Sequence, residues 1–394
     1  MYALYQHYGY STGQIGKLFI AGFGSSMVFG TIVGSLGDKH GRRNAALLYC
    51  ATYVASCITK HWSTFEVLML GRIFGGIATS LLFSAFESWL VAEHFKRGYD
   101  AGWLSGTFSK AIFLGNGLVS IVCGLLANFL VDNLELGPVA PFDAASVFLC
   151  IGAAVITFTW SENYGDASEN TSLQQQFKTA CNAIATDQKV ALLGAMQSLF
   201  EAAMYTFVFL WTPALSPKGE VIPHGTIFST FMVSSMIGSS FAARLMPGPT
   251  RVEVYMQAVF AVSALALTVP ILVDATGVGT EPAADGGITF AGQLQLAGFL
   301  VFEVCVGIFW PSIMKMRSTY VPEEVRSTIM NFFRIPLNLF VCCILYNVDA
   351  FSLRTMFGMC VLFLVASAGC QRQLDRITAT SSYFVLPEVV DHDK

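Results

Sequence analysis

Charged residues are scarce in this chain, and neither sign is in large excess. Of its 394 residues only 12% are Asp, Glu, Lys or Arg, whereas 54% are hydrophobic. A soluble domain carries roughly 25% charged residues, so a deficit of this size means that most side chains face lipid or other helices. The formal net charge of −4 is small, which favours neither a nucleic acid nor an acidic partner.

The sequence also lacks the motifs of enzymes, metal sites and disulfide frameworks. It has no HExxH, no GxSxG and no glycine loop that would cradle a phosphate, and its six histidines are scattered. Most of its ten cysteines lie in or beside apolar runs without a CxxC spacing, as small buried hydrophobic residues do. We therefore expect no enzymatic activity, no metal site and no cofactor.

What the chain does have is a succession of long apolar segments. A bilayer core needs about 20 apolar residues per helix, and eleven segments of the sequence qualify. These segments are residues 14–37, 44–60, 64–90, 102–131, 141–160, 190–213, 225–246, 253–273, 288–314, 325–348 and 352–372. The sequence predicts an all-α polytopic membrane protein embedded in a lipid bilayer.

A polar stretch divides the apolar segments into five and six. We expect an N-terminal helical half at residues 1–160, a cytoplasmic linker at 161–189, a C-terminal half at 190–372 and a tail at 373–394. Within the linker, residues 173–184 are predicted to form a surface helix. Lys and Arg concentrate in alternate loops when the loop at 38–43 is placed in the cytoplasm, and this bias predicts a cytoplasmic C-terminus.

The loop at 38–43 belongs to a motif, GSLGDKHGRR, that begins at Gly34. Gly41 permits a tight turn, Asp38 can accept hydrogen bonds from a helix N-terminus, and Arg42 and Arg43 lie at the membrane face. The motif resembles the major facilitator superfamily signature G-x-L-x-D-x-x-G-R-[RK], which lies between helices two and three of twelve. The resemblance implies the major facilitator fold with its first helix missing from this chain, through either a late start of the sequence or a natural short form.

Further strings resemble one branch of that superfamily, the eukaryotic molybdate-anion transporter family. They are LFSAFESW at 82–89, LGPVAPF at 136–142, WSENY at 160–164, QSLFE at 197–201, FVFLWTP at 207–213 and NFFRIP at 331–336. The resemblance covers essentially the whole chain. It implies a monomeric, multi-pass plasma-membrane transporter for cellular uptake of molybdate, a tetrahedral dianion.

Ionisable residues within the predicted helices are candidates for the transport machinery, because charges at membrane depth are expensive and usually functional. We expect Arg334 and Lys110 to bind the oxyanion, since a guanidinium matches two oxygens of a tetrahedral anion. Asn116, Gln197 and Trp211 are candidates for further hydrogen bonds to it. As alternatives, Arg334 pairs with a carboxylate as structural glue, and Lys110 extends to the cytoplasmic surface.

Three carboxylates and one arginine are candidates for proton coupling or for charge pairing. Glu201 and Glu303 fall near the midplane of their predicted helices, whereas Glu87 lies toward the cytoplasmic end, where a gate or a packing contact is the alternative. Arg72 matches an arginine that is tied to proton coupling in some members of the superfamily. A carboxyl group in a low dielectric environment exchanges a proton readily during a transport cycle.

Two classes of function remain open beside molybdate uptake by alternating access with proton coupling. One is a major facilitator carrier of another small solute, such as sulfate, a sugar or a peptide, since sulfate has the charge and shape of molybdate. The other is a membrane sensor that keeps the fold without transporting.

Overall fold

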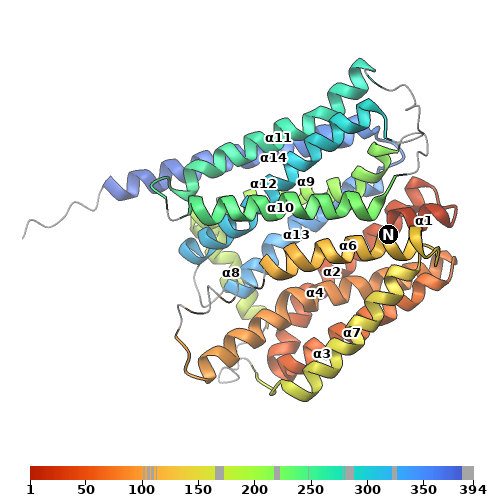
Figure 1. Ribbon diagram of the computed structural model, residues 1–394. Helices are drawn as coiled ribbons and strands as arrows, with labels where there is room; N and C mark the ends of the chain where they lie inside the picture. The colour runs from red at the N-terminus through yellow and green to blue at the C-terminus, as the bar shows by residue number, and fades with distance from the viewer. Residues whose placement is uncertain are drawn as a thin grey trace, which may run out of the picture.

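The computed structural model is a bundle of long helices (Figure 1). It describes residues 1–383 apart from 101–102, 104–106, 108–110, 112, 165–172, 217–221, 247, 278, 280–287 and 322–325. Its helices are α1 (Tyr2–His7), α2 (Thr12–His40), α3 (Arg42–Ile58), η1 (Thr59–His61), α4 (Phe65–Lys96), η2 (Phe113–Val119), α6 (Ser120–Asn128), η3 (Phe129–Asn133), α7 (Ala140–Thr159), α8 (Leu173–Thr186), α9 (Gln188–Leu215), α10 (His224–Leu245), α11 (Val252–Thr276), α12 (Phe290–Tyr320), α13 (Arg326–Tyr346) and α14 (Leu353–Tyr383). No strand occurs in this described part of the chain, so the all-α prediction is confirmed.

Each predicted segment has a matching helix. In the segment predicted at 102–131 the structure has η2, α6 and η3, and η2 and η3 are π-helical. The predicted surface helix is α8. The last helix, α14, continues past residue 372 to Tyr383, and the short α1 was not predicted because six residues are too few to show an apolar period.

Eight helical segments in the described residues are long and apolar enough to cross a membrane. The other three predicted segments correspond to α2, which is rich in glycine and serine, to the 17-residue α3, and to α13, whose apolar part is the short Phe332–Tyr346. Large apolar side chains also cover the outside of the bundle, and Phe158 on α7 is 87% exposed. Apolar surface on this scale suits lipid rather than water.

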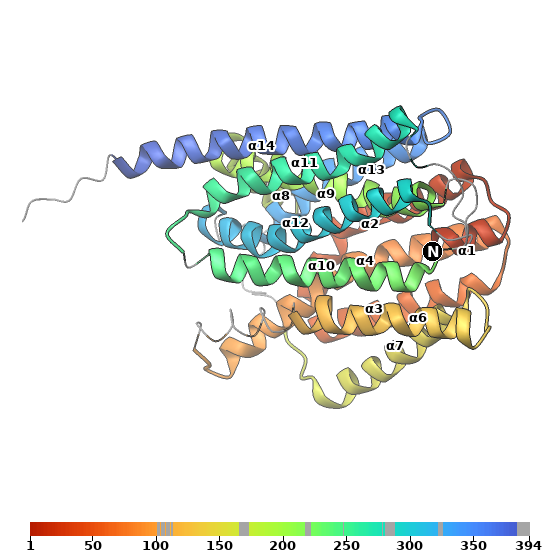
Figure 2. The ribbon, with the colours of Figure 1, turned by 45° about the horizontal axis from the view of Figure 1, so that its top comes forward.

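The helices gather in two groups (Figure 1). One group contains α2, α3, α4, α6 and α7, and the other contains α9 to α14. Between the groups α2 packs on α13 and α6 packs on α10. The α1 segment and the far end of α14 lie at opposite ends of the bundle in both views (Figure 2).

Candidate functional site

A cavity of about 150 Å³ lies where α2, α3, α4 and α7 meet α9 and α13. Its lining residues are Met1, Gly22, Phe23, Ser26, Tyr53, Ser56, Cys57, Lys60, Arg72, Gly75, Gly76, Thr79, Phe142, Tyr205 and Arg334. It is large enough for several water molecules, and so for one small polyatomic ion. Three of the lining residues have basic side chains: Lys60, Arg72 and Arg334.

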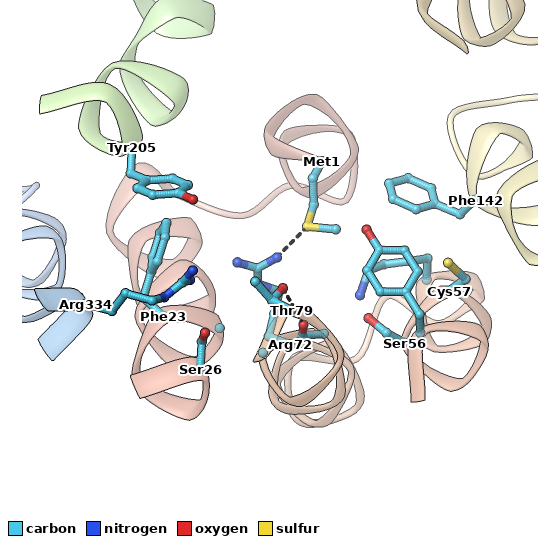
Figure 3. Close-up of a pocket in the computed structure, with 15 residues that line it drawn as sticks. Met1, Phe23, Ser26, Ser56, Cys57, Arg72, Thr79, Phe142, Tyr205 and Arg334 are labelled. Carbon is cyan, nitrogen blue, oxygen red and sulfur yellow. Dashed lines mark hydrogen bonds between the residues drawn. The ribbon is translucent and has the colours of Figure 1, made fainter. Parts of the chain in front are cut away.

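Arg72 enters the cavity from α4 because α2 has no side chain where the two helices cross. A methyl group on Gly22 would lie 2.4 Å from the Arg72 guanidinium. The guanidinium donates from Nε to the Leu18 carbonyl at 3.1 Å, and it lies over the Phe19 ring at 4.7 Å from the centroid. Another of its nitrogens contacts the Met1 sulfur at 2.9 Å (Figure 3). Arg72 is therefore fixed along one side, and its charge faces the cavity.

Arg334 enters the same cavity from α13, on the other side of the bundle (Figure 3). Its guanidinium lies 4.2 Å from the centroid of the Phe83 ring, which belongs to α4. The backbone just before it is anchored to α9, where the Ser198 hydroxyl donates to the Phe333 carbonyl at 2.7 Å. α13 continues as a helix through Pro336. Arg334 thus joins the two helix groups at the cavity.

Lys60 is the residue of the site that sequence reasoning missed. It lies in η1 and is fully buried, with its ammonium 3.3 Å from the Thr59 hydroxyl and 5.9 Å from the centroid of the Tyr5 ring. A lysine at the end of an apolar segment normally extends to the surface. The sequence carries no signal that this one turns inward. Tyr8, the residue directly after α1, holds η1 in place, because its hydroxyl donates to the Lys60 carbonyl.

No carboxylate in the described part of the chain forms an ion pair with Lys60, Arg72 or Arg334. Glu201 lies close enough to feel the charge of Arg334, but its Oε1 accepts a 2.7 Å hydrogen bond from Gln197. Glu201 therefore interacts with Arg334 through its charge and not through an ion pair among the described contacts, and pairing of Arg334 with Glu201 or Glu303 stays the alternative to anion binding. Lys60 is fully buried, whereas Arg72 and Arg334 are half-buried. Buried charges are normally paired, so a cavity whose lining has three basic side chains and no acidic one is suited to an anion.

The other predicted site residues that the structure describes are not among the residues that line this cavity. Gln197 and Glu201 are buried on α9, and Glu201 is one helical turn from Tyr205. Trp211 contacts the rings of His224 and Phe231. Glu303 is buried on α12. Lys110 lies outside the described residues, and so do the side chains of Asn116 and Glu87.

The signature loop forms a tight junction between α2 and α3. Gly41 has φ +106°, so the turn requires glycine. The Glu162 carboxylate, at the end of α7, accepts from the backbone N–H of Arg43 at 2.8 Å and of Asn44 at 3.3 Å, as expected for an acid at a helix N-terminus. The backbone N–H of Arg42 donates to the Asn163 carbonyl, and the Arg43 guanidinium donates to the Thr157 carbonyl.

At the N-terminus of α3 the acceptor is thus Glu162, and the role expected for Asp38 stays a prediction. Gly34 and Asp38 lie in the last turns of α2, and the side chain of Asp38 is outside the described ones.

The same segment after α7 is fixed to the end of α4. The Trp160 and Trp89 rings stack at 3.6 Å between centroids, the Trp89 indole donates to the Ser161 carbonyl, and the Ser161 hydroxyl donates to Glu93. A hydrogen bond from Arg97 holds the pKa of Glu93 below its ordinary value. The ends of α2, α4 and α7 therefore form one connected unit at the end of the bundle opposite Lys60.

Comparisons with known proteins agree with this architecture. A family model described as sugar transporters, 12 TM, matches residues 1–299. The nucleoside transporter NupG has a TM-score of 0.67 at 13% identity, over 95% of this chain and 93% of its own. An auto-inhibited POT family peptide transporter has a TM-score of 0.65 at 12% identity, over 97% and 90% of the two chains. The fold is therefore that of a membrane transporter of the major facilitator type.

Sequence relatives narrow the class to one family. The molybdate-anion transporter of Xenopus laevis is 32% identical over 392 residues, which are 98% of this chain and 84% of the relative. That of Danio rerio is 33% identical over 364 residues, or 87% and 73% of the two chains. This chain belongs to the molybdate-anion transporter family of the major facilitator superfamily.

Proposed function

We propose that this protein is a secondary transporter of the plasma membrane that takes molybdate into the cell by alternating access. It acts as a monomer with its C-terminus in the cytoplasm. The relatives named as molybdate-anion transporters support the substrate, and the apolar helices support the membrane location.

One observation carries the proposal: three cations without an acidic partner among the described residues line a single cavity. A sugar, which the description of the family model names, is neutral and would leave those charges uncompensated. A tetrahedral dianion instead accepts hydrogen bonds from guanidinium and ammonium groups at several oxygens. Sulfate is also a tetrahedral dianion, so the cavity favours this class of anion without distinguishing its members. Membership of the molybdate-anion transporter family supports molybdate as the member that is transported.

In the proposed cycle the halves at 1–160 and 190–372 rock around this cavity, joined by the linker at 161–189. Arg334 binds the anion from the C-terminal half and Lys110 from the N-terminal half, with Asn116, Gln197 and Trp211 as further donors. The signature loop, held by Glu162, stabilises one of the two states.

The proposal is tested by uptake of radiolabelled molybdate into cells that express the protein, compared with cells that do not. We expect saturable uptake that excess unlabelled molybdate suppresses. Equal uptake by both cell lines, with the protein at the surface, would favour a sensor over a transporter.

Proton coupling gives a separate expected result. A dianion that enters a cell against an inside-negative potential of 100 mV costs about 4.6 kcal/mol, which inward proton movement offsets. Glu201 is the candidate carrier because it is buried beside Arg334, with Glu303 and Glu87 as the others. We expect uptake to rise as the external pH falls, and Glu201→Gln to remove most of this dependence.

The control for this experiment is Glu66→Gln, which changes an exposed carboxylate at the start of α4. It should keep the wild-type pH profile. A wild-type uptake rate that does not change with external pH would end the coupling role of all three carboxylates.

A further inference from the structure

Lys60 is a buried charge without the partner that buried charges require. An ammonium has three donors, and the described contacts satisfy one of them, through the Thr59 hydroxyl. The side chain is fully buried and lines the cavity. Burying an unpaired ion is costly, so this position calls for an anion that is not part of the described chain.

The Lys60 ammonium also lies close to Arg72. A methyl group on Gly71, the residue before Arg72, would be 3.0 Å from the Lys60 Nζ atom and 1.9 Å from the Thr59 hydroxyl. The absence of a side chain at Gly71 therefore lets η1 approach α4. The charges of Lys60 and Arg72 act on one another, and two like charges at short range in a low dielectric repel strongly.

The three cations of the cavity lie at different depths. Lys60 is at the end of the bundle where α3 turns into η1. Arg72 lies about 10 Å inside the start of α4, and Arg334 lies about 18 Å from Tyr346 at the end of α13. These ends lie on the same side, since the Leu345 carbonyl and Val348 pack against Gly16 in the first turns of α2. The cations thus form a series from the Lys60 end toward the middle.

We propose that Lys60, together with Arg72, is the charge-selecting element of this site and makes the transporter prefer a dianion over a monoanion of the same shape. This inference rests on the proposed function and adds to it a specificity-determining residue. With Arg334 the cavity has three positive charges, and a dianion compensates two of them and so reduces the repulsion between Lys60 and Arg72. A monoanion compensates only one, so the site discriminates by charge where shape is equal.

The test compares molybdate with perrhenate, a tetrahedral oxyanion with a single negative charge. Uptake of each radiolabelled anion is measured over a concentration series, and the ratio of the two kcat/KM values is the readout. For the wild type we expect a clear preference for molybdate. Lys60→Met should reduce this ratio by about tenfold or more, which corresponds to about 1.4 kcal/mol, while Lys60→Arg should keep it.

Lys17→Met is the matched control, because Lys17 on α2 is exposed and its loss should leave the ratio unchanged. Lys60→Gln provides the same comparison if the methionine variant reaches the surface poorly. If the role of Lys60 is structural, its loss reduces the uptake of both anions equally and leaves the ratio of the two kcat/KM values unchanged. An unchanged ratio in Lys60→Met or Lys60→Gln would therefore overturn the inference. Absence of wild-type molybdate uptake would instead overturn the proposed function itself.

Discussion

Replacing Arg334 with alanine is expected to reduce molybdate uptake by at least about tenfold, with the protein at its normal level at the cell surface. Arg334 lines the cavity from α13 and forms no ion pair with a carboxylate in the described residues. A hydrogen bond to a charged group contributes about 1.5–3 kcal/mol, so loss of the contact between the guanidinium and the anion accounts for an effect of this size. The measurement is uptake of radiolabelled molybdate normalised to surface protein.

Two further variants test whether the loss of uptake is specific to the guanidinium group of Arg334. Arg334→Lys keeps the charge but loses the planar fork that matches two oxygens, so we expect uptake between those of the wild type and Arg334→Ala. Arg354→Ala removes an exposed arginine at the start of α14 and should leave uptake unchanged. Normal uptake by Arg334→Ala at normal surface level would remove Arg334 from the binding site.

Replacing Gly76 with alanine is expected to impair both folding and transport. A methyl group there would lie 1.8 Å from the Ser25 hydroxyl, 2.5 Å from the Gly22 carbonyl and 2.9 Å from the Ser26 backbone nitrogen. Because two of these atoms are backbone, α2 must move away from α4. Overpacking of this kind costs about 1–3 kcal/mol, and the shift separates Gly22 from Arg72 and so distorts the cavity.

Gly24→Ala is the control for this prediction. Gly24 lies within α2, and a methyl group on it meets no atom within 4 Å. Because alanine is favoured over glycine in a helix by about 1 kcal/mol, this variant should be as stable as the wild type or more so. We expect thermal unfolding in detergent to show a lower Tm for Gly76→Ala alone. Equal Tm values for the two variants would contradict the close packing of α2 on α4.

The fold was predictable because its main signals are local. Each apolar segment of sufficient length became a helix, and the positions of Gly41, Arg42 and Arg43 marked the junction of α2 and α3. The sequence also placed Arg334 in the middle of its helix. Each of these features depends on the residues of a single segment and not on the helices that pack against it.

The cavity was not predictable, because it depends on which helices meet. Lys60 is at the end of its segment, and only the contact of η1 with Gly71 and the hydrogen bond from Tyr8 show that it turns inward. Arg72 was expected in proton coupling, yet it shares the cavity with Arg334 because Gly22 leaves space for it. Glu162 lies far from the signature loop in sequence, so its contact with α3 could not be read from the motif. The assignments of Lys110, Asn116 and Glu87 stay predictions, since their side chains are outside the described ones.

Counterflow measures directly whether this protein moves a tetrahedral dianion across a membrane, as we propose. Purified protein is reconstituted into liposomes loaded with unlabelled molybdate, and traces of labelled molybdate are added outside. We expect a transient accumulation of label that external sulfate reduces, that a neutral sugar leaves unchanged, and that Arg334→Ala reduces by about tenfold or more. Accumulation no greater than in protein-free liposomes would contradict this proposal.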